Sequence, residues 1–303
     1  MQLIAIILVA LSAFIHAGWN LASKRQHPSA AFFLITSLTG ILLFSPILFM
    51  YGRTALPGFS VKVWTFLVAT GFFMALYYIS LAGAYRSGEL SVAYPLARSS
   101  PVIVVSVVAF LLGRGAQVSF ICVLGIILVV GGCFLIPMQK FREFRLNRYL
   151  NATCGLALLA AIGTSGYSII DDEALRTLRN NPDISLNTTQ VTLLYSFCEA
   201  LAVSLWLFLF IAVRRNGRLD MRETLRTKTR HAILAGLAIH ITYAIVLVSL
   251  AFAKNVSYVV GFRQLSIPLG AVFGIVILKE QPHIPKIMGV AIMFIGLLLV
   301  AMG

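Results

Sequence analysis

Charged residues and cysteines are scarce in this sequence. Of its 303 residues only 11% are Asp, Glu, Lys or Arg, whereas 59% are hydrophobic. A soluble domain carries about 25% charged residues, so this composition argues against a water-soluble enzyme, a disordered chain and a secreted disulfide scaffold. The four cysteines lie in apolar stretches and show no CxxC spacing, which predicts neither a disulfide nor a metal site.

Several catalytic and nucleotide-binding signatures are also missing. No GxxxxGK, HExxH or GxSxG motif occurs, which argues against an ATP-driven pump and leaves no indication of a cofactor. Acidic residues number ten against 24 Lys and Arg, giving a net charge of +14. In a soluble protein this balance would indicate nucleic acid. No basic stretch is interleaved with aromatic residues here, so we expect basic cytoplasmic loops and no nucleic-acid partner.

Long apolar runs account for most of the chain. A membrane-spanning helix needs about 20 apolar residues, and the sequence offers ten such runs separated by Pro, Gly and charged residues. We therefore predict an all-α polytopic membrane protein with ten transmembrane helices. Residues 1–13 carry no positive n-region and predict a first membrane helix rather than a cleaved signal peptide. The ten runs are residues 2–22, 30–50, 63–84, 90–112, 118–137, 151–170, 190–213, 231–253, 257–278 and 285–302.

The distribution of Lys and Arg among the loops predicts the topology. Loops after the first, third, fifth, seventh and ninth runs carry 16 cations in total, and the loops between the others carry 6. Because cytoplasmic loops are enriched in Lys and Arg, the first set is expected to be cytoplasmic. Both termini would then lie outside, in a multi-pass protein of the cytoplasmic membrane.

The two halves of the sequence resemble each other. Gly125 and Gly132 in the fifth run have the same spacing as Gly289 and Gly296 in the tenth. Seven residues are about two helical turns, so each pair makes a smooth stripe for a neighbouring helix. Five helices per half is an odd number, which predicts two inverted repeats, an architecture of secondary transporters. We place the repeats at residues 1–138 and 151–303, joined by a basic linker at 139–150.

Three segments resemble the EamA branch of the drug/metabolite transporter superfamily. They are His16-Ala17-Gly18-Trp19-Asn20-Leu21, Tyr94-Pro95-Leu96-Ala97-Arg98 with Pro101, and Arg263-Gln264-Leu265-Ser266 running to Leu278-Lys279-Glu280. The resemblance implies two EamA repeats around a central cavity and movement of small metabolites. The arginine-containing segments are most similar to a branch associated with phosphonate use. Members often have Gly-Glu where this sequence has Gly113-Arg114, whereas the second half keeps Lys279-Glu280.

Two arginines lie well inside apolar runs, Arg98 in the fourth and Arg263 in the ninth. A charge at mid-bilayer costs ~2.5–3.5 kcal/mol on insertion scales, so such groups face a cavity or a partner. The guanidinium fork suits a carboxylate or phosphate, and we expect both arginines to bind an anionic group. Alternatively, one or both pair with Glu199 or backbone carbonyls as structural locks. Two cations against one buried acid favour an anionic or zwitterionic substrate.

Three other ionisable residues inside the runs are candidates for coupling transport to an ion gradient. Glu199 could carry a proton or act as the fixed counter-ion of Arg263. His16 and His240 occupy similar positions in the first and eighth runs. Histidine titrates near neutrality and could relay protons; the alternative is a hydrogen-bonded contact between helices.

Amphipathic side chains near the arginines, or at positions paired by the repeat, are candidates for the cavity wall. They are Trp19, Tyr78, Tyr94, Tyr167, Tyr243 and Gln264. Each could equally serve packing or an interfacial belt. Pro95, Pro101 and Pro268 each remove a backbone donor and predict kinks or breaks beside the cavity.

An acidic cluster follows the sixth run. We interpret Asp171, Asp172 and Glu173 as a solvated cap at a helix end rather than a cation site.

These features favour a secondary active transporter of a small anionic or zwitterionic metabolite that works by alternating access. A proton or another ion would be its coupling partner, and it would be a monomer or homodimer in the lipid bilayer. One alternative is a flippase for a lipid-linked substrate, which requires a lateral opening between helices. The other is a membrane-embedded enzyme or a scaffold without transport; an enzyme should hold a nucleophile within hydrogen-bond reach of a base.

Overall fold

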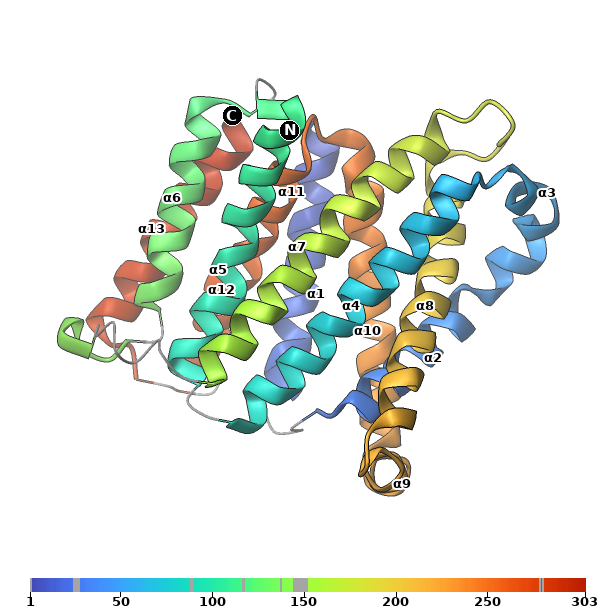
Figure 1. Ribbon diagram of the computed structural model, residues 1–303. Coiled ribbons are helices and arrows are strands. Elements are labelled where there is room, and N and C mark those ends of the chain that lie inside the picture. The colour runs from blue at the N-terminus through green and yellow to red at the C-terminus, as the bar shows by residue number, and fades with distance from the viewer. Residues whose placement is uncertain are drawn as a thin grey trace.

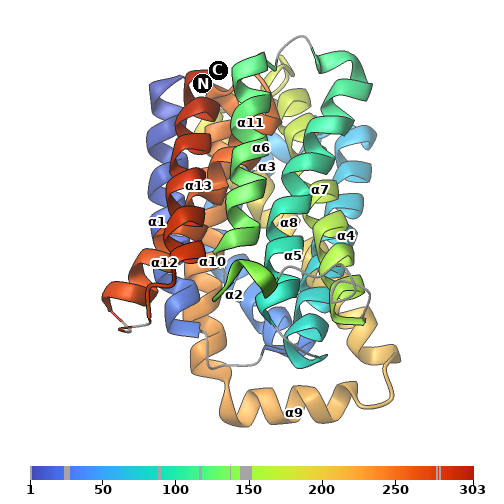
Figure 2. The ribbon, with the colours of Figure 1, turned by 90° about the vertical axis from the view of Figure 1, so that its left-hand side faces the viewer.

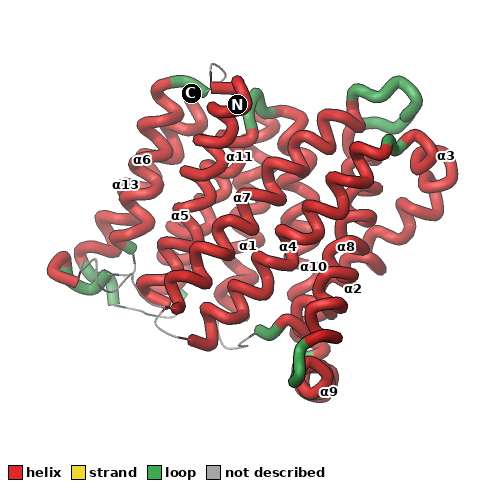
Figure 3. Tube along the Cα trace, viewed as in Figure 1, coloured by secondary structure: helices red, strands yellow, loops and turns green. Residues whose placement is uncertain are grey.

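The regular structure of the described residues is entirely helical (Figures 1 and 3). The computed structural model describes residues 2–23, 28–87, 90–115, 118–136, 138–143, 152–277, 279 and 281–303. Within these ranges the side chains of residues 19–23, 85–87, 90–96, 98–99, 114, 143 and 274 are outside the description.

The helices follow one another with short connections. They are α1 (Leu3–Ser23), α2 (Ala30–Ile47), α3 (Arg53–Ala55), α4 (Val61–Ser87), α5 (Leu90–Ala109), α6 (Phe120–Leu135), α7 (Ala152–Arg179), α8 (Thr188–Val213), α9 (Gly217–Thr227), α10 (Thr229–Ser249), α11 (Val256–Phe262), α12 (Ser266–Val276) and α13 (Ile284–Met302). Seven helical segments are long and apolar enough to cross a membrane, and three shorter apolar helices accompany them in the described residues. Each of the ten predicted runs overlaps one of these segments, as expected for a polytopic membrane protein.

The molecular surface is apolar and its interior is partly polar. Phe49, Phe120 and Val213 are 83%, 81% and 88% exposed, while Asp171 is 0% and Glu199 4% exposed. In a soluble protein, large apolar side chains would be buried and lone acids exposed. The opposite distribution fits a bundle whose solvent on the outside is lipid.

Helix starts follow ordinary capping chemistry. The Ser29 side chain accepts a hydrogen bond from the Phe32 N–H at the start of α2, and Ser119 accepts from Cys122 at the start of α6. Asn187 and Gln190 form a capping box at the start of α8. These side chains satisfy backbone donors that have no partner within the helix.

One predicted boundary and one predicted break are wrong, and one helix was not expected. The sixth run does not end at residue 170, because α7 continues to Arg179. The fourth run is not broken at Pro95 or Pro101, since α5 is one α-helix from Leu90 to Ala109. The basic segment between α8 and α10, predicted only as a loop, contains α9.

Neighbouring helices pair across the two halves of the chain. α4 lies against α7 and α8, while α1 and α2 lie against α10; α2 also packs on α8, and α6 on α13. Figure 1 shows both termini at the same end of the bundle, and Figure 2 shows α9 lying across the opposite end.

The glycine stripes predicted from the sequence meet in the α6–α13 contact. A methyl group built on Gly125 would lie 2.6 Å from the Gly296 carbonyl oxygen, and one on Gly132 would lie 2.7 Å from the Gly289 oxygen. Likewise, a methyl group built on Gly289 would lie 2.7 Å from the Gly132 oxygen, and one built on Gly296 would lie 2.7 Å from the Gly125 oxygen. The earlier glycine of α6 thus meets the later glycine of α13, and the later meets the earlier. The two helices are therefore antiparallel, and their backbones touch.

Because α6 and α13 touch through backbone, Gly132→Ala should destabilise the protein by about 1–3 kcal/mol through overpacking. Gly131→Ala is the matched control, since a methyl group there has no atom within 4 Å. The thermal unfolding midpoint in detergent should fall for Gly132→Ala only. Equal midpoints for the two variants would contradict the close contact.

Candidate functional site

A buried carboxylate lies where four helices meet. Asp171 of α7 is 0% exposed and accepts hydrogen bonds from hydroxyl groups of three other helices. Thr70 Oγ1 of α4 and Tyr195 Oη of α8 donate to Oδ1 at 2.6 and 2.7 Å, and Tyr243 Oη of α10 donates to Oδ2 at 2.5 Å. A buried acid needs such donors to replace its hydration.

The prediction that Asp171 and Asp172 form a solvated cap is therefore wrong: they are 0% and 1% exposed. The physical reason is that the buried face of α7 continues past them through Ala174, Leu175 and Leu178. Asp171 and these three residues are spaced i, i+3, i+4 and i+7, the pattern of one helix face. That spacing was the signal in the sequence that could have placed Asp171 in the interior.

Arg263 lies where the ninth apolar segment is interrupted. Residues Arg263–Leu265 form a 3₁₀ turn between α11 and α12. Pro268 has no N–H to donate to the Gln264 carbonyl four residues earlier, and its ring would clash with that carbonyl in a regular α-helix. The predicted kink or break at Pro268 thus corresponds to a local tightening of the helix into a 3₁₀ turn that contains Arg263, with the flanking residues still in the right-handed helical region.

The Arg263 guanidinium lies over an aromatic ring. Its carbon is 5.3 Å from the centroid of Tyr243, the same tyrosine that donates to Asp171. Tyr167 of α7 packs edge-on against Tyr243, with ring centroids 5.4 Å apart. Within the described part of the chain, no carboxylate lies within ion-pair distance of the guanidinium; it contacts the ring face, and Asp171 and Glu199 act on it at longer range.

A small pocket opens beside this arginine. It is lined by Ser168, Tyr243 and Arg263 and by aliphatic side chains of α10, α11 and the turn after α10. The Ser168 hydroxyl is buried and has no hydrogen-bond partner among the described residues. The cavity measures about 10 Å³, room for about one water molecule, and the hydroxyl, the guanidinium and the aromatic ring are the polar groups on its wall.

Two further buried oxygens near the pocket lack partners in the described structure. Glu199 Oε1 and Gln264 Oε1 accept no hydrogen bond there, although Gln264 Nε2 donates to the Val260 carbonyl at 3.1 Å. The charges of Glu199, Asp171 and Arg263 are close enough to interact. Buried acceptors without donors are rare in folded proteins, and they cluster here around one arginine.

The structure brings together five of the predicted site residues: Arg263, Gln264, Tyr243, Tyr167 and Glu199. Tyr78 belongs to the same aromatic cluster, stacked on Phe33 with ring centroids 4.4 Å apart. The side chains of Arg98, Tyr94 and Trp19 lie outside the described residues. The backbone of Arg98 lies in α5, which packs against α11.

The two histidines lie in other helix contacts. His240 is buried, contacts Gly40 of α2 and packs edge-on against Phe44, with ring centroids 6.1 Å apart. Its Nε2 has no hydrogen-bond partner in the described structure. His16 is half-buried in α1.

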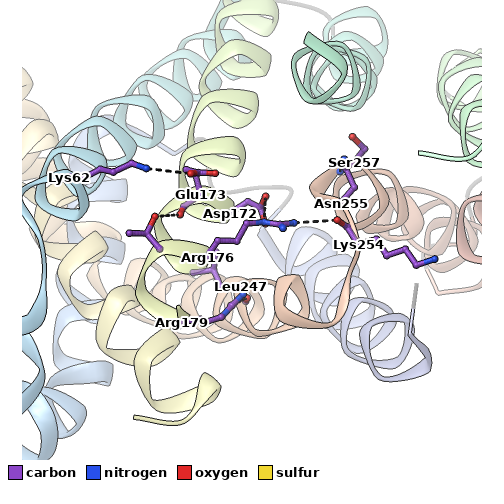
Figure 4. Close-up of polar contacts among 10 residues, drawn as sticks. Lys62, Asp172, Glu173, Arg176, Arg179, Leu247, Lys254, Asn255 and Ser257 are labelled. Atoms are coloured by element: carbon purple, nitrogen blue, oxygen red, sulfur yellow. Dashed lines mark hydrogen bonds and ion pairs between the residues drawn. The ribbon is translucent and has the colours of Figure 1, made fainter. Parts of the chain in front are cut away.

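A charged cluster caps the site one turn further along α7 (Figure 4). Arg176 Nε bonds Asp172 Oδ1 and Oδ2 at 3.0 and 2.9 Å, and its Nη2 donates to the Lys254 carbonyl at 3.3 Å. Arg179 Nη2 donates to the Leu247 carbonyl at 3.0 Å. Lys62 of α4 pairs with Glu173 at 3.5 Å. These contacts join α7 to α4, to α10 and to the turn before α11.

This cluster was not predicted from the sequence. The i, i+4 spacing of Asp172 and Arg176 indicates a helical ion pair, but the acids had been assigned to a helix end. Arg176 and Arg179 bond to backbone carbonyls of the turn after α10 and of α10 itself. Which carbonyls they reach depends on the tertiary structure and could not be predicted from the sequence.

A helical membrane protein with a polar interior at an interrupted spanning segment has the construction of a small-molecule transporter. Residues 3–138 match the EamA-like transporter family, so the chain carries an EamA domain, of the drug/metabolite transporter superfamily, over this part. Domains of this family transport and are not enzymes. No curated protein sequence matches the chain.

One solved crystal structure is similar over nearly the whole chain. It covers 98% of this chain and 95% of its own length, with a TM-score of 0.63 and 16% sequence identity. At that identity the similarity shows the fold alone, and the fold extends through both halves.

The hydrogen bonds to Asp171 predict a stability effect. Tyr243→Phe removes one donor to a buried carboxylate and keeps the ring beneath Arg263, so we expect a loss of about 1.5–3 kcal/mol. Tyr167→Phe is the control, because the Tyr167 hydroxyl makes no hydrogen bond in the described structure. Denaturation in detergent should separate the two variants. A Tyr243→Phe protein as stable as Tyr167→Phe would refute the role of this hydroxyl.

Proposed function

We propose that the protein is a secondary active transporter that moves a small anionic or zwitterionic metabolite across the cytoplasmic membrane by alternating access. The observation that carries this proposal is the Arg263 guanidinium at the break between α11 and α12. It lies on a pocket with the unpaired Ser168 hydroxyl, and no carboxylate of the described residues neutralises it. A free guanidinium inside a membrane protein is a binding group for an anion.

Inverted five-helix repeats at residues 1–138 and 151–303 are part of the proposal. The packing supports them, because the most extensive helix contacts have counterparts when the first apolar segment is matched to the sixth, the second to the seventh, and so on. Thus α4 on α7 corresponds to α10 on α1, and α4 on α8 to α10 on α2. The matching maps the contact of α2 with α8 onto itself, and likewise the contact of α6 with α13. This is expected for pairs of segments that lie on a two-fold axis.

Arg98 and Arg263 occupy matching places in the two repeats, in the fourth and ninth segments. Because α5 and α11 pack together, we place both arginines beside the axis between the repeats. Tyr167, Tyr243 and Gln264 complete the site around Arg263, and Trp19 and Tyr94 are assigned to the matching wall on the side of Arg98. The basic loops at the α9 end are assigned to the cytoplasm and both termini to the outside.

Thermal unfolding with a ligand panel tests the anion site. Carboxylates, phosphates, phosphonates, amino acids and organic cations would be added to detergent-purified wild type, Arg263→Gln and Arg98→Gln. A ligand at 100 times its Kd stabilises by about 2.7 kcal/mol. We expect an anionic or zwitterionic ligand to stabilise wild type, with at least a tenfold weaker Kd in each variant because the fork for the anion is lost.

The control is Arg53→Gln, which removes an exposed cation far from the pocket and should leave the ligand shift unchanged. Stabilisation by organic cations alone, equal in wild type and Arg263→Gln, would contradict the proposal.

Coupling is assigned to a proton carried by Glu199 at the site or by His240 in the contact of α10 with α2, since each is a buried titratable side chain that keeps an unpaired atom in the described structure; His16 is the remaining candidate. In proteoliposomes, Glu199→Gln should abolish accumulation driven by a pH gradient, because an amide releases no proton, yet allow exchange of labelled for unlabelled substrate. Glu223→Gln, on the exposed face of α9, is the control.

If gradient-driven accumulation persists in Glu199→Gln and fails in His240→Gln, the histidine is the carrier. If it persists in both variants, neither of these residues couples transport.

A further inference from the structure

α9 is a short helix that lies across one end of the bundle. Figure 2 shows it running roughly perpendicular to the membrane-spanning helices. It packs against α2, α8 and α10. Its buried Thr224 lies 3.3 Å, hydroxyl to hydroxyl, from Ser29 at the start of α2. The helix is thus docked on the protein by one face, and its other face is free for a partner.

The free face is strongly basic. Arg218, Arg222 and Arg226 are exposed and follow each other at intervals of four, so they form one stripe along the helix. None of the three has an ion pair within the part of the chain that the structure describes.

The acids of α9 are used elsewhere. Asp220 Oδ2 lies 3.7 Å from Arg214 Nη1, and Glu223 Oε1 lies 4.0 Å from Lys228 Nζ. Both pairs involve cations at the ends of α9, not those of the stripe. The two carboxylates therefore leave the positive charge of the stripe uncompensated.

Apolar side chains border the stripe on both sides. Leu219 is 65% and Leu225 56% exposed. At about 100° per residue, the three arginines span about 80° of the helix circumference, and each leucine lies about 20° beyond one edge of it. The exposed face of α9 is therefore basic with apolar edges, and a basic segment next to membrane-spanning helices is attracted to anionic headgroups.

The chain fixes α9 at that depth. It follows the membrane-spanning α8 after three residues and ends one residue before the membrane-spanning α10. At 1.5 Å per residue, a 26-residue helix such as α8 is about 39 Å long, which exceeds a hydrocarbon core of about 30 Å. α8 is thus long enough to extend beyond the core, and we place its end, and α9 with it, among the headgroups.

We propose that the Arg218–Arg222–Arg226 face of α9 binds the phosphate groups of anionic phospholipids in the surrounding leaflet. Guanidinium forks bind phosphate oxygens in pairs, and a polybasic segment beside a membrane helix is attracted to anionic lipid. The lipid holds α9 against the bilayer and thereby fixes the ends of α8 and α10. This inference requires the membrane placement of the chain but not the transport proposed above.

The test uses the full-length protein in a zwitterionic detergent, titrated with phosphatidylglycerol or with phosphatidylcholine of the same acyl chains. The thermal unfolding midpoint reports binding. We expect wild type to bind phosphatidylglycerol more tightly than phosphatidylcholine. Arg222→Gln/Arg226→Gln should weaken phosphatidylglycerol binding about 25-fold at low salt, taking about 1 kcal/mol per cation near an anionic surface. The lipid preference should also shrink at high salt.

Arg53→Gln/Lys254→Gln is the matched control. It removes the same charge from exposed positions near the opposite end of the bundle and should leave the preference for phosphatidylglycerol unchanged. Arg222→Lys/Arg226→Lys keeps the charge and should retain most of the binding, which separates lost contacts from misfolding.

Three results would overturn the proposal. One is equal affinity of wild type for the two lipids, and another is an equal loss in the control variant. The third is displacement of phosphatidylglycerol by soluble polyglutamate, together with a loss of polyglutamate affinity in Arg222→Gln/Arg226→Gln as large as the loss of lipid affinity. The face would then be a docking site for acidic polymers rather than for lipid.

Discussion

A carboxylate held inside a membrane protein must obtain its hydrogen bonds from protein, and the arrangement of the interior follows from how Asp171 obtains them. Its three donors come from α4, α8 and α10, so four helices are fixed relative to one another around two oxygen atoms. Thr70 belongs to the first half of the chain and the other residues to the second. Apolar packing against lipid-like neighbours gives little directional preference. The hydrogen bonds at Asp171 orient the four helices relative to one another. The glycine contact lets the backbones of α6 and α13 approach closely at the edge of the bundle.

The sequence allowed prediction of those features that depend on spacing along one helix. The ten apolar runs, the glycine pairs seven residues apart and the break before Pro268 each follow from local geometry or backbone chemistry, and the structure contains them. Arg263, Tyr243, Tyr167, Gln264 and Glu199 were selected because polar groups are rare in such runs. That they lie near one another could not be derived, since it depends on how α7, α8, α10 and α11 pack.

The errors in prediction have a common cause. Asp is usually found at helix ends because its side chain competes for backbone donors, and so Asp171 and Asp172 were assigned to a cap. In the structure both side chains are satisfied by other partners, hydroxyl groups for Asp171 and Arg176 for Asp172. The helix then continues to Arg179. Likewise, kinks or breaks were expected at the prolines of α5, and the helix assignment continues through both of them without a break.

Tyr243 connects the two charged groups of the site through one ring. Its hydroxyl donates to Asp171, and its face lies beneath Arg263. A phenol that donates a hydrogen bond to a carboxylate gains electron density in its ring, which strengthens the attraction of the ring face for a cation. An anion that draws Arg263 off the ring would remove this support and alter the hydrogen bond at Asp171, where α4 of the first half meets α7, α8 and α10 of the second. In the proposed mechanism, binding at Arg263 and the packing between the two halves would thus be linked through one side chain, as alternating access requires of a site between two repeats.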